Sequence, residues 1–221
     1  MASRKASRSV GRSLWKTIWP AWDDVLASRA RLSPEGGSME ARIISVTPWL
    51  EARPAALEHA EALADLVRRN ADHFRRYLPA VAAMSSVEQT RSHLGQVAGR
   101  AARDEVLEWY LFADGVLCGA MRLNKIELEN RKTSISYLLD AGHQGRGIGT
   151  LAVRALLRHC FVDLGMNRVE LTCATDNVHS IRLAERVGFA REGLLRQAEW
   201  LGGCFVDHYV YGLLRSAYVS G

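Results

Sequence analysis

The sequence predicts an α/β (α+β) domain with a mixed central sheet flanked by helices. Apolar, β-branched runs typical of strands alternate with segments in which apolar residues recur every three or four positions, the spacing of a helix. A glycine-rich run at residues 144–150 follows one such strand and precedes one such helix. In addition, the Asp114-Gly115 pair joins two apolar runs and is a strong signal for a hairpin.

A short strand and three helices open the domain. The strand is expected at residues 50–53, and Pro54 is expected to begin the first helix because proline suits the first helical turn. Pro79 is expected to end the second helix. The three helices are expected at residues 54–70, 72–78 and 87–103.

Strands make up most of the second half of the chain. The hairpin at Asp114-Gly115 is followed by a polar connection at residues 124–131, and a helix is expected from Ile148 to about Gly165. A second hairpin is expected near Gly202-Gly203. The strands before this last hairpin are expected at residues 106–113, 116–123, 133–139 and 168–175.

The glycine-rich run has the properties of a phosphate-binding loop. Gly145, Gly147 and Gly149 let the backbone turn sharply and bring consecutive N–H groups close to a ligand with no Cβ in the way. The start of the following helix adds unpaired donors and the positive end of its dipole, and Arg146 adds charge. The alternative, a tight turn without a ligand, stays open.

Two nucleotide-binding motifs do not fit this loop. A dinucleotide site requires Gly-x-Gly-x-x-Gly and an acidic residue at the end of the next strand, whereas this loop is Gly-x-Gly-x-Gly and that strand reaches Asp176 only at its far end. A P-loop requires a lysine before its final Ser or Thr, and Gly149-Thr150 has none. What remains, Gln-x-x-Gly-x-Gly from Gln144, resembles the pyrophosphate loop of the GNAT acyl-coenzyme A N-acyltransferases.

Further motifs follow in the order of that family. Asn177-Val178-His179-Ser180 and the sequence IRLAERVGF resemble its Asn-x-x-Ser helix and Gly-Phe turn. The segment EGLLRQAEWLGGCFVDHYVYGLL, residues 192–214, is similar to the closing segment of the RimL-type branch, which acetylates the N-termini of ribosomal proteins. The resemblance is continuous over about residues 135–214 and extends loosely back to Trp49.

The resemblance implies a GNAT fold, with about six to seven strands splayed at the cofactor site, and acetyl-CoA as the acyl donor without a metal. Tyr137, Leu138 and Leu139 are then expected to hold the pantetheine arm through free main-chain groups, and the amide of Leu138 or a near neighbour to polarise the thioester carbonyl. The residues expected to bind the diphosphate are Gln144, Gly145, Arg146, Gly147, Ile148, Gly149 and Thr150.

The same resemblance implies two catalytic groups. Glu199 matches the branch's catalytic glutamate and is expected to take the proton of the amine, with Trp200 reducing its hydration. Ser180 is expected to protonate the leaving thiolate, and Asn177 to bind the pantetheine arm. Each has a plainer alternative: Glu199 as a surface residue of a strand, and Asn177 and Ser180 as polar residues of a helix start.

Family membership implies an amine acceptor that attacks the thioester directly in a ternary complex. The RimL-type branch points to the α-amine of a protein N-terminus, and related members to aminoacyl small molecules or transfer RNA. A homodimer is expected by the same resemblance. Contacts to an acidic acceptor are expected from a few residues that also fit a solvated helix face: Phe74, Arg75, Arg76, Tyr77 and His93.

Composition suits a cytoplasmic enzyme. No apolar stretch approaches the roughly 18 residues that cross a bilayer, so no membrane partner is expected. Cys118, Cys160, Cys173 and Cys204 lack the spacing of a zinc site or a disulfide framework. We expect them to be buried thiols in a reducing compartment, and we expect no metal.

The first forty residues are expected to form an extension, residues 1–40, before an acetyltransferase domain at residues 41–221. Of the 29 lysines and arginines, seven lie in residues 1–31 against two of the 24 acidic residues, so this segment carries the whole net charge of +5. Apolar and aromatic residues between Leu14 and Leu26 suggest a short helix interrupted by Pro20. RNA contact through residues 1–31 and packing against the domain are the two alternatives. Met39 is a candidate original start.

Two other function classes stay open. A coenzyme A binding module without turnover would keep the glycine loop but would not need Glu199. A nucleic-acid-associated acyltransferase or binding protein would depend on the basic extension, and its affinity would fall steeply with salt.

Overall fold

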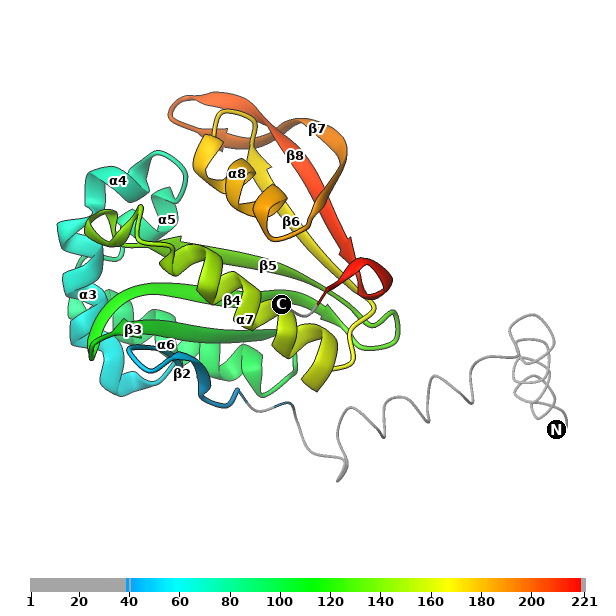
Figure 1. Cartoon of the computed structure of the whole chain (residues 1–221). Coiled ribbons are helices and arrows are strands. Elements are labelled where there is room, and N and C mark those ends of the chain that lie inside the picture. The colour runs from blue at the N-terminus through cyan, green and yellow to red at the C-terminus, as the bar shows by residue number, and fades with distance from the viewer. Residues whose placement is uncertain (1–38, 40, 220–221) are drawn as a thin grey trace, which may run out of the picture. The chain divides into compact units, whose positions relative to one another are not determined.

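An eight-stranded sheet in the order β1-β2-β3-β4-β5-β6-β8-β7 runs through the computed structural model (Figure 1). The structure describes Met39 and residues 41–219. Neighbouring strands are antiparallel except β5 and β6, which are parallel, so the predicted mixed sheet is confirmed. It has one strand more than the expected six to seven. The strands are β1 (Ile44–Thr47), β2 (Leu50–Pro54), β3 (Val106–Ala113), β4 (Val116–Glu127), β5 (Lys132–Leu139), β6 (Arg168–Ala174), β7 (Ala190–Leu201) and β8 (Cys204–Leu214).

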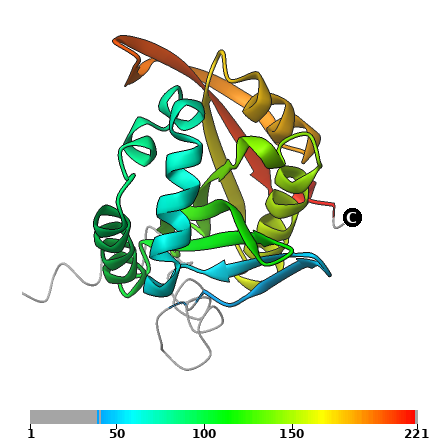
Figure 2. The same ribbon diagram turned by 90° about the vertical axis from the view of Figure 1, so that its left-hand side faces the viewer.

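Helices cover both faces of this sheet, as Figure 2 shows. The α-helices are α3 (Ala60–Arg69), α4 (Ala71–Arg75), α5 (Pro79–Ala82), α6 (Val87–Ala101), α7 (Ile148–Arg158) and α8 (Val178–Arg186). Short 3₁₀ turns lie at Leu57–His59, Ala141–His143 and Arg215–Ala217, and a π-helical turn at His159–Asp163 extends α7. The predicted helices are therefore present, in shorter pieces than expected.

Two apolar clusters hold the helices to the sheet, because successive strand residues point to opposite faces. Trp109 and Leu111 of β3 belong to a cluster with α7, whereas Tyr110 and Phe112 belong to a cluster with α3 and α6. All eight residues of β3 are buried, which makes it the centre of the core. Met39 packs into the α7 cluster, and its main-chain N–H donates to Asp104 Oδ1 at 2.6 Å.

Four boundaries differ from the prediction. Pro54 ends β2 instead of beginning a helix. Proline is tolerated there because β1 pairs with β2 only as far as Ala52, so no neighbouring strand on that side needs the N–H that proline lacks. Pro79 opens α5 instead of only ending the helix before it. Residues 124–127 continue β4 instead of forming a connection, with Glu127 opposite Lys132. The strand at residues 44–47 was not predicted.

The gap between β5 and β6 positions the site. Their ladder covers only three register pairs, from Lys132 opposite Arg168 to Ser134 opposite Glu170. Beyond Ser134 the two strands diverge toward the glycine loop (Figure 1). Residues 135–139 therefore pair with β4 alone. This splay agrees with the GNAT fold implied by the sequence.

Candidate functional site

The glycine loop, which connects β5 to α7, is open to solvent. Gln144, Gly145, Arg146 and Gly147 are exposed, while the side chain of Ile148 is buried in the core, so that Ile148 can offer a ligand only its main chain. Gly147 is the N-cap of α7 and brings no side chain to cap the first N–H groups of the helix. Those donors face outward at the positive end of the helix dipole, which favours an anion.

The three loop glycines serve different purposes. Gly145 and Gly147 have φ values of +73° and +80°, a conformation that L side chains rarely adopt, and a Cβ at either position would meet no atom within 4 Å. Gly149 has an ordinary φ, but its Cβ would lie 3.0 Å from Leu183 Cδ1 on α8. The first two glycines therefore shape the turn, and the third lets α7 and α8 approach each other.

Two residues at the end of α3, which the sequence did not single out, anchor this loop. Asn70 is buried, and its Oδ1 accepts the N–H of Ala141 at 2.9 Å. Arg69 lies with its Nε 3.3 Å from Asp140 Oδ2 and donates through Nη2 to the carbonyl of Leu117 at 2.7 Å. Because these contacts join residues 48 to 71 positions apart, only the folded chain reveals them.

Asp140 links that anchor to His143. Its Oδ2 lies 3.0 Å from His143 Nδ1, and its Oδ1 accepts the N–H of Gly142 at 3.3 Å. Burial by itself would raise the pKa of Asp140, but hydrogen bonds from Asn70, His143 and Gly142 hold that pKa below its usual value. His143 is therefore a partner of the loop anchor. Gln144 Nε2 contacts His73 Nε2 of α4 at 2.8 Å, so that α4 as well as α3 is connected to the loop.

Along the end of β5, every second residue turns its main-chain groups away from β4 and toward the gap. The N–H of Asp140 donates to the carbonyl of Cys118 on β4 at 2.8 Å. Main-chain groups alternate sides along a strand, so Leu138 also turns its N–H toward β4, while Tyr137 and Leu139 turn theirs toward the gap. Of the amides expected to polarise the thioester carbonyl, those of Tyr137 and Leu139 thus face the gap, whereas that of Leu138 faces β4.

The side chains of Tyr137 and Ser180 meet between β5 and α8. Their hydroxyl oxygens are 2.9 Å apart. Burial raises the pKa of Tyr137 to about 12, so its hydroxyl keeps its proton at neutral pH. Asn177 is the N-cap of α8, and its Oδ1 accepts the N–H of Ser180 at 3.2 Å. The capping role considered for Asn177 is present, which leaves its amide nitrogen for a ligand.

Glu199 lies on β7, on the exposed β7–β8 hairpin. Its side chain is 44% exposed, and one oxygen lies 3.2 Å from His208 Nε2. Trp200 is 59% exposed, stacks edge-on against Phe205 and points to the opposite face of the strand. The expectation that Trp200 reduces the hydration of Glu199 is therefore wrong for the single chain.

The residues considered for an acidic acceptor already have partners. Phe74 is buried, Arg75 pairs with Asp72 at 2.9 Å, and His93 Nε2 contacts Glu108 at 3.2 Å. Arg76 and Tyr77 both bind Asp176, through its carboxylate at 2.9 Å and its carbonyl at 3.1 Å. These contacts tie the segment after α4 to the end of β6, across the mouth of the gap.

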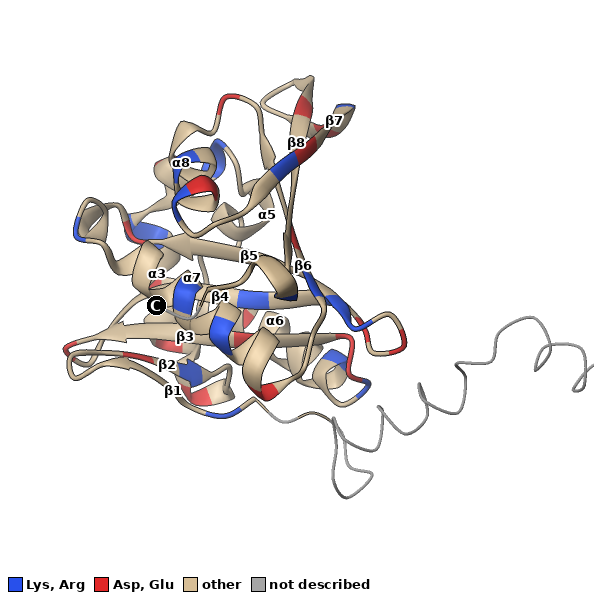
Figure 3. Cartoon of the chain, turned by 45° about the vertical axis from the view of Figure 1, so that its right-hand side comes forward, with Lys and Arg blue, Asp and Glu red and all other residues tan. Residues whose placement is uncertain are grey.

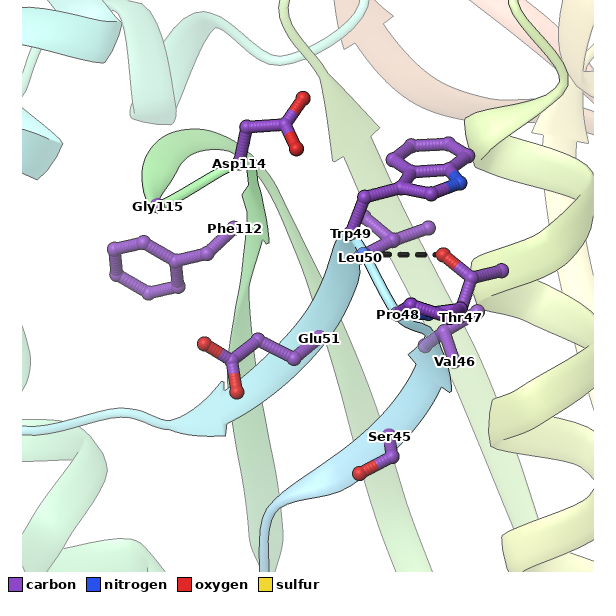
Figure 4. Close-up of a pocket in the computed structure, with 10 residues that line it drawn as sticks. All are labelled: Ser45, Val46, Thr47, Pro48, Trp49, Leu50, Glu51, Phe112, Asp114 and Gly115. Carbon is purple, nitrogen blue, oxygen red and sulfur yellow. Dashed lines mark hydrogen bonds between the residues drawn. The ribbon is translucent and has the colours of Figure 1, made fainter.

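Figure 4 shows a separate hollow, at the β1–β2 and β3–β4 turns. Trp49, Glu51 and Asp114 line it, and the N–H of Leu50 donates to Thr47 Oγ1 at 3.0 Å on its floor. None of the predicted site residues line this hollow. The gap between β5 and β6 therefore stays the candidate site.

The described domain also carries scattered charges and four free thiols. Lys and Arg residues and Asp and Glu residues are both spread over its ribbon (Figure 3). Over Met39 and residues 41–219, no group of three metal-ligating side chains is present, and no helix is long and apolar enough to cross a membrane. Cys118, Cys160 and Cys173 are buried as expected, but Cys204 is exposed at the β7–β8 turn, contrary to expectation. Burial raises the pKa of Cys118 to about 11.

Comparison with known proteins adds the family. The model of the acetyltransferase (GNAT) domain matches residues 50–190. The chain belongs to this family. The ribosomal-protein-serine acetyltransferase of Escherichia coli is 32% identical over 168 residues, which cover 76% of this chain and 94% of that protein.

Two solved structures extend this likeness to the GNAT fold and its ligand. RimL, a ribosomal α-N-protein acetyltransferase in complex with coenzyme A, superposes with a TM-score of 0.75 at 31% identity, covering 78% of this chain and 98% of that one. The microcin self-immunity acetyltransferase MccE, in complex with acetyl-CoA and AMP, gives 0.73 at 28%, covering 76% and 94%. This GNAT chain is accordingly an N-acetyltransferase, and the two solved structures that it resembles hold coenzyme A and acetyl-CoA.

Beside the α3 anchor, two side-chain contacts near the predicted site residues of this GNAT chain could not be predicted from the sequence. Arg186 of α8 donates to the hydroxyl of Thr150 at 3.3 Å and brings a cation to the glycine loop. His208 reaches Glu199 across β7 and β8. Neither contact has a motif of its own, since each depends on the pairing of distant elements.

Proposed function

We propose that this acetyltransferase moves acetyl from acetyl-CoA to the α-amine of a protein N-terminus or of an aminoacyl small molecule, by direct attack in a ternary complex. The observation that carries the proposal is the open edge of β5, where Tyr137 and Leu139 turn unpaired main-chain groups toward a gap that ends at the exposed glycine loop. An extended pantetheine arm fits such an edge as an added strand would.

The cofactor is held in two parts in this proposal. The N–H groups from Gly145 to Thr150, with Arg146 and Gln144, bind the diphosphate at the start of α7. Tyr137, Leu138 and Leu139 line the pantetheine arm, and the amide of Asn177 binds it from α8. The exposed loop, the uncapped helix start and the short β5–β6 ladder support this arrangement.

The reaction needs three groups in addition. Glu199 takes the proton from the attacking amine, and an amide of Tyr137 or Leu139 stabilises the oxyanion of the tetrahedral intermediate. When the C–S bond breaks, the sulfur takes a proton from Ser180, which Tyr137 orients through hydroxyls 2.9 Å apart. Glu199 then releases the amine proton to solvent and Ser180 regains a proton from solvent, so the protons balance over one turnover. No metal takes part in the proposed steps.

Two relatives guide the choice of acceptor. The Escherichia coli relative is named for a ribosomal-protein serine, and RimL for the α-amine of a ribosomal protein. MccE, a self-immunity enzyme crystallised with AMP, points instead to a small molecule. We propose a protein N-terminus as the first acceptor to test and an aminoacyl-nucleotide as the second.

Incubation with acetyl-CoA and matched amines tests this function. A peptide with a free N-terminal serine should gain one acetyl group by mass spectrometry, and the same peptide with a blocked N-terminus should not. Glu199→Gln should lower kcat about 100-fold, the usual loss for a missing general base. Glu129→Gln, an exposed glutamate at the β4–β5 turn, is the matched control. Unchanged turnover in Glu199→Gln would rule out this residue as the base.

We also propose that the chain forms a homodimer, that it works in the cytoplasm and that its basic extension has a role of its own. Leu194, Trp200 and Phe205 are half-exposed or more on one face of the β7–β8 hairpin, and a second copy would cover them. The free thiols suit a reducing compartment. Residues 1–31 lie outside the described part of the chain, and their charge of +5 supports RNA contact as the alternative function.

A further inference from the structure

His208 on β8 has a buried imidazole nitrogen that nothing in the reaction scheme explains. Its Nε2 is inaccessible to solvent, and no residue of the described domain gives it a well-aligned hydrogen bond. Glu199 Oε2 lies 3.2 Å away, close enough for a hydrogen bond but out of line for one. A buried polar atom without a partner costs stability and calls for a physical reason.

The residues paired with His208 in the sheet are apolar, and Glu199 is the charged side chain that contacts its Nε2. Ala174 of β6 and Leu195 of β7 lie directly opposite His208. The next residues on the same face of β8 are Val206 and Val210. These apolar side chains cannot accept a hydrogen bond, which leaves the carboxylate of Glu199, 3.2 Å from Nε2, as a group that can accept one after a small reorientation.

A β-bulge in β7 brings Glu199 to this place. The register moves from Leu195 opposite His208 to Glu199 opposite Val206. Over this stretch β7 advances by four residues and β8 by two. Gln197 in the bulge has a φ of +51°, and its N–H donates to Asp207 Oδ1 at 2.8 Å. Bulges next to active sites commonly re-aim a side chain, and here the bulge turns Glu199 toward the face of His208.

We propose that His208 is a positioning residue for Glu199, a refinement that rests on the proposed function. The Nε2–H of His208 donates to the carboxylate and fixes its orientation toward the amine. Catalytic hydrogen bonds are often poorly aligned without substrate and tighten only when it binds. Asp207 supports the same arrangement from the other face by holding the bulge.

Two variants of His208 separate positioning from packing. His208→Leu fills the space but cannot donate, and it should lower kcat about tenfold, as for one lost hydrogen bond to a charged group, with KM for acetyl-CoA unchanged. His208→Gln can still donate and should keep kcat within about threefold. Equal losses in both variants, or full activity in His208→Leu, would overturn the proposal.

A double substitution tests whether His208 acts through Glu199. In the Glu199→Gln background, His208→Leu should cause no further loss, because the carboxylate that it positions is already gone. A further tenfold loss would mean that His208 acts on its own and would contradict the proposal. Circular dichroism and melting temperature of each variant show whether it is folded.

A spectroscopic measurement keeps this inference separate from the proposed function. In the ¹⁵N spectrum of the full chain, the imidazole signals of His208 are assigned by their loss in His208→Gln. Glu199→Gln should shift them, whereas Glu129→Gln should not. Unshifted signals would overturn the contact even in an active enzyme. Shifted signals in an enzyme that acetylates no amine would instead sink the proposed function alone.

Discussion

Gly147 shows how one residue sets the shape of the cofactor loop. Its φ of +80° is available to glycine at little cost, and no atom lies within 4 Å of where a Cβ would be. The constraint at this position is therefore conformational and not steric. Gly149, whose Cβ would press on Leu183, carries the opposite constraint.

Gly147→Ala should therefore weaken cofactor binding without filling any occupied space. A left-handed conformation costs an L residue about 1 kcal/mol, and relief of that strain would move the N–H groups at the start of α7. We expect acetyl-CoA to bind about five to ten times more weakly by calorimetry. Gly142→Ala is the matched control, because its Cβ would sit 3.9 Å from the nearest atom and its φ is ordinary. Equal affinities of the two variants would count against the loop as the diphosphate site.

At the scale of elements, a buried charge cluster ties α6 to the sheet. Glu108 of β3 is buried and pairs with Arg122 of β4 and with His93 of α6. Burial by itself would raise the pKa of Glu108, but the hydrogen bond from His93 and the charge of Arg122 hold that pKa below its usual value. This cluster lies on the face of the sheet that α3 and α6 cover.

Arg122→Met should destabilise the fold by about 3 kcal/mol in urea unfolding at neutral pH, because it leaves a buried carboxylate without its main partner. Since the folded pKa of Glu108 is depressed, its contribution is present above the unfolded carboxyl pKa and is lost as the pH falls through the lower, folded one. The difference between the two proteins should therefore shrink at acidic pH. The double variant Glu108→Gln with Arg122→Met should recover part of the loss. A constant difference across this pH range would contradict the assignment.

At the scale of the whole molecule, the β7–β8 hairpin leaves Leu194, Trp200 and Phe205 on one exposed face. If a second copy covers them, Phe205→Asp should place a charge in the interface and shift the full chain to monomers in sedimentation velocity. Val116→Asp, which charges an equally exposed apolar residue at the start of β4, should leave the distribution unchanged. A monomeric wild-type chain would refute the dimer directly.

Local patterns were enough for many elements but not for their ends. The run from Val106 to Ala113 and the turn at Asp114-Gly115 were predicted as found, because strand period and turn chemistry are local properties. Pro54 was misplaced because its tolerance in β2 depends on where β1 stops pairing. Residues 124–127 were taken for a loop because their polar side chains pair across β4 and β5, which composition does not show.

The sequence by itself predicted the GNAT family, which comparison with known proteins confirmed, and the place of the glycine loop, since these depend on residue types at fixed spacing along one stretch of chain. The tertiary structure alone decided which β5 amides face the gap, how Asn70 and Asp140 hold the loop, and that His208 lies against Glu199. Such contacts join segments far apart in sequence, where pairing register and not spacing sets the distance. Register is fixed only when the whole sheet has packed.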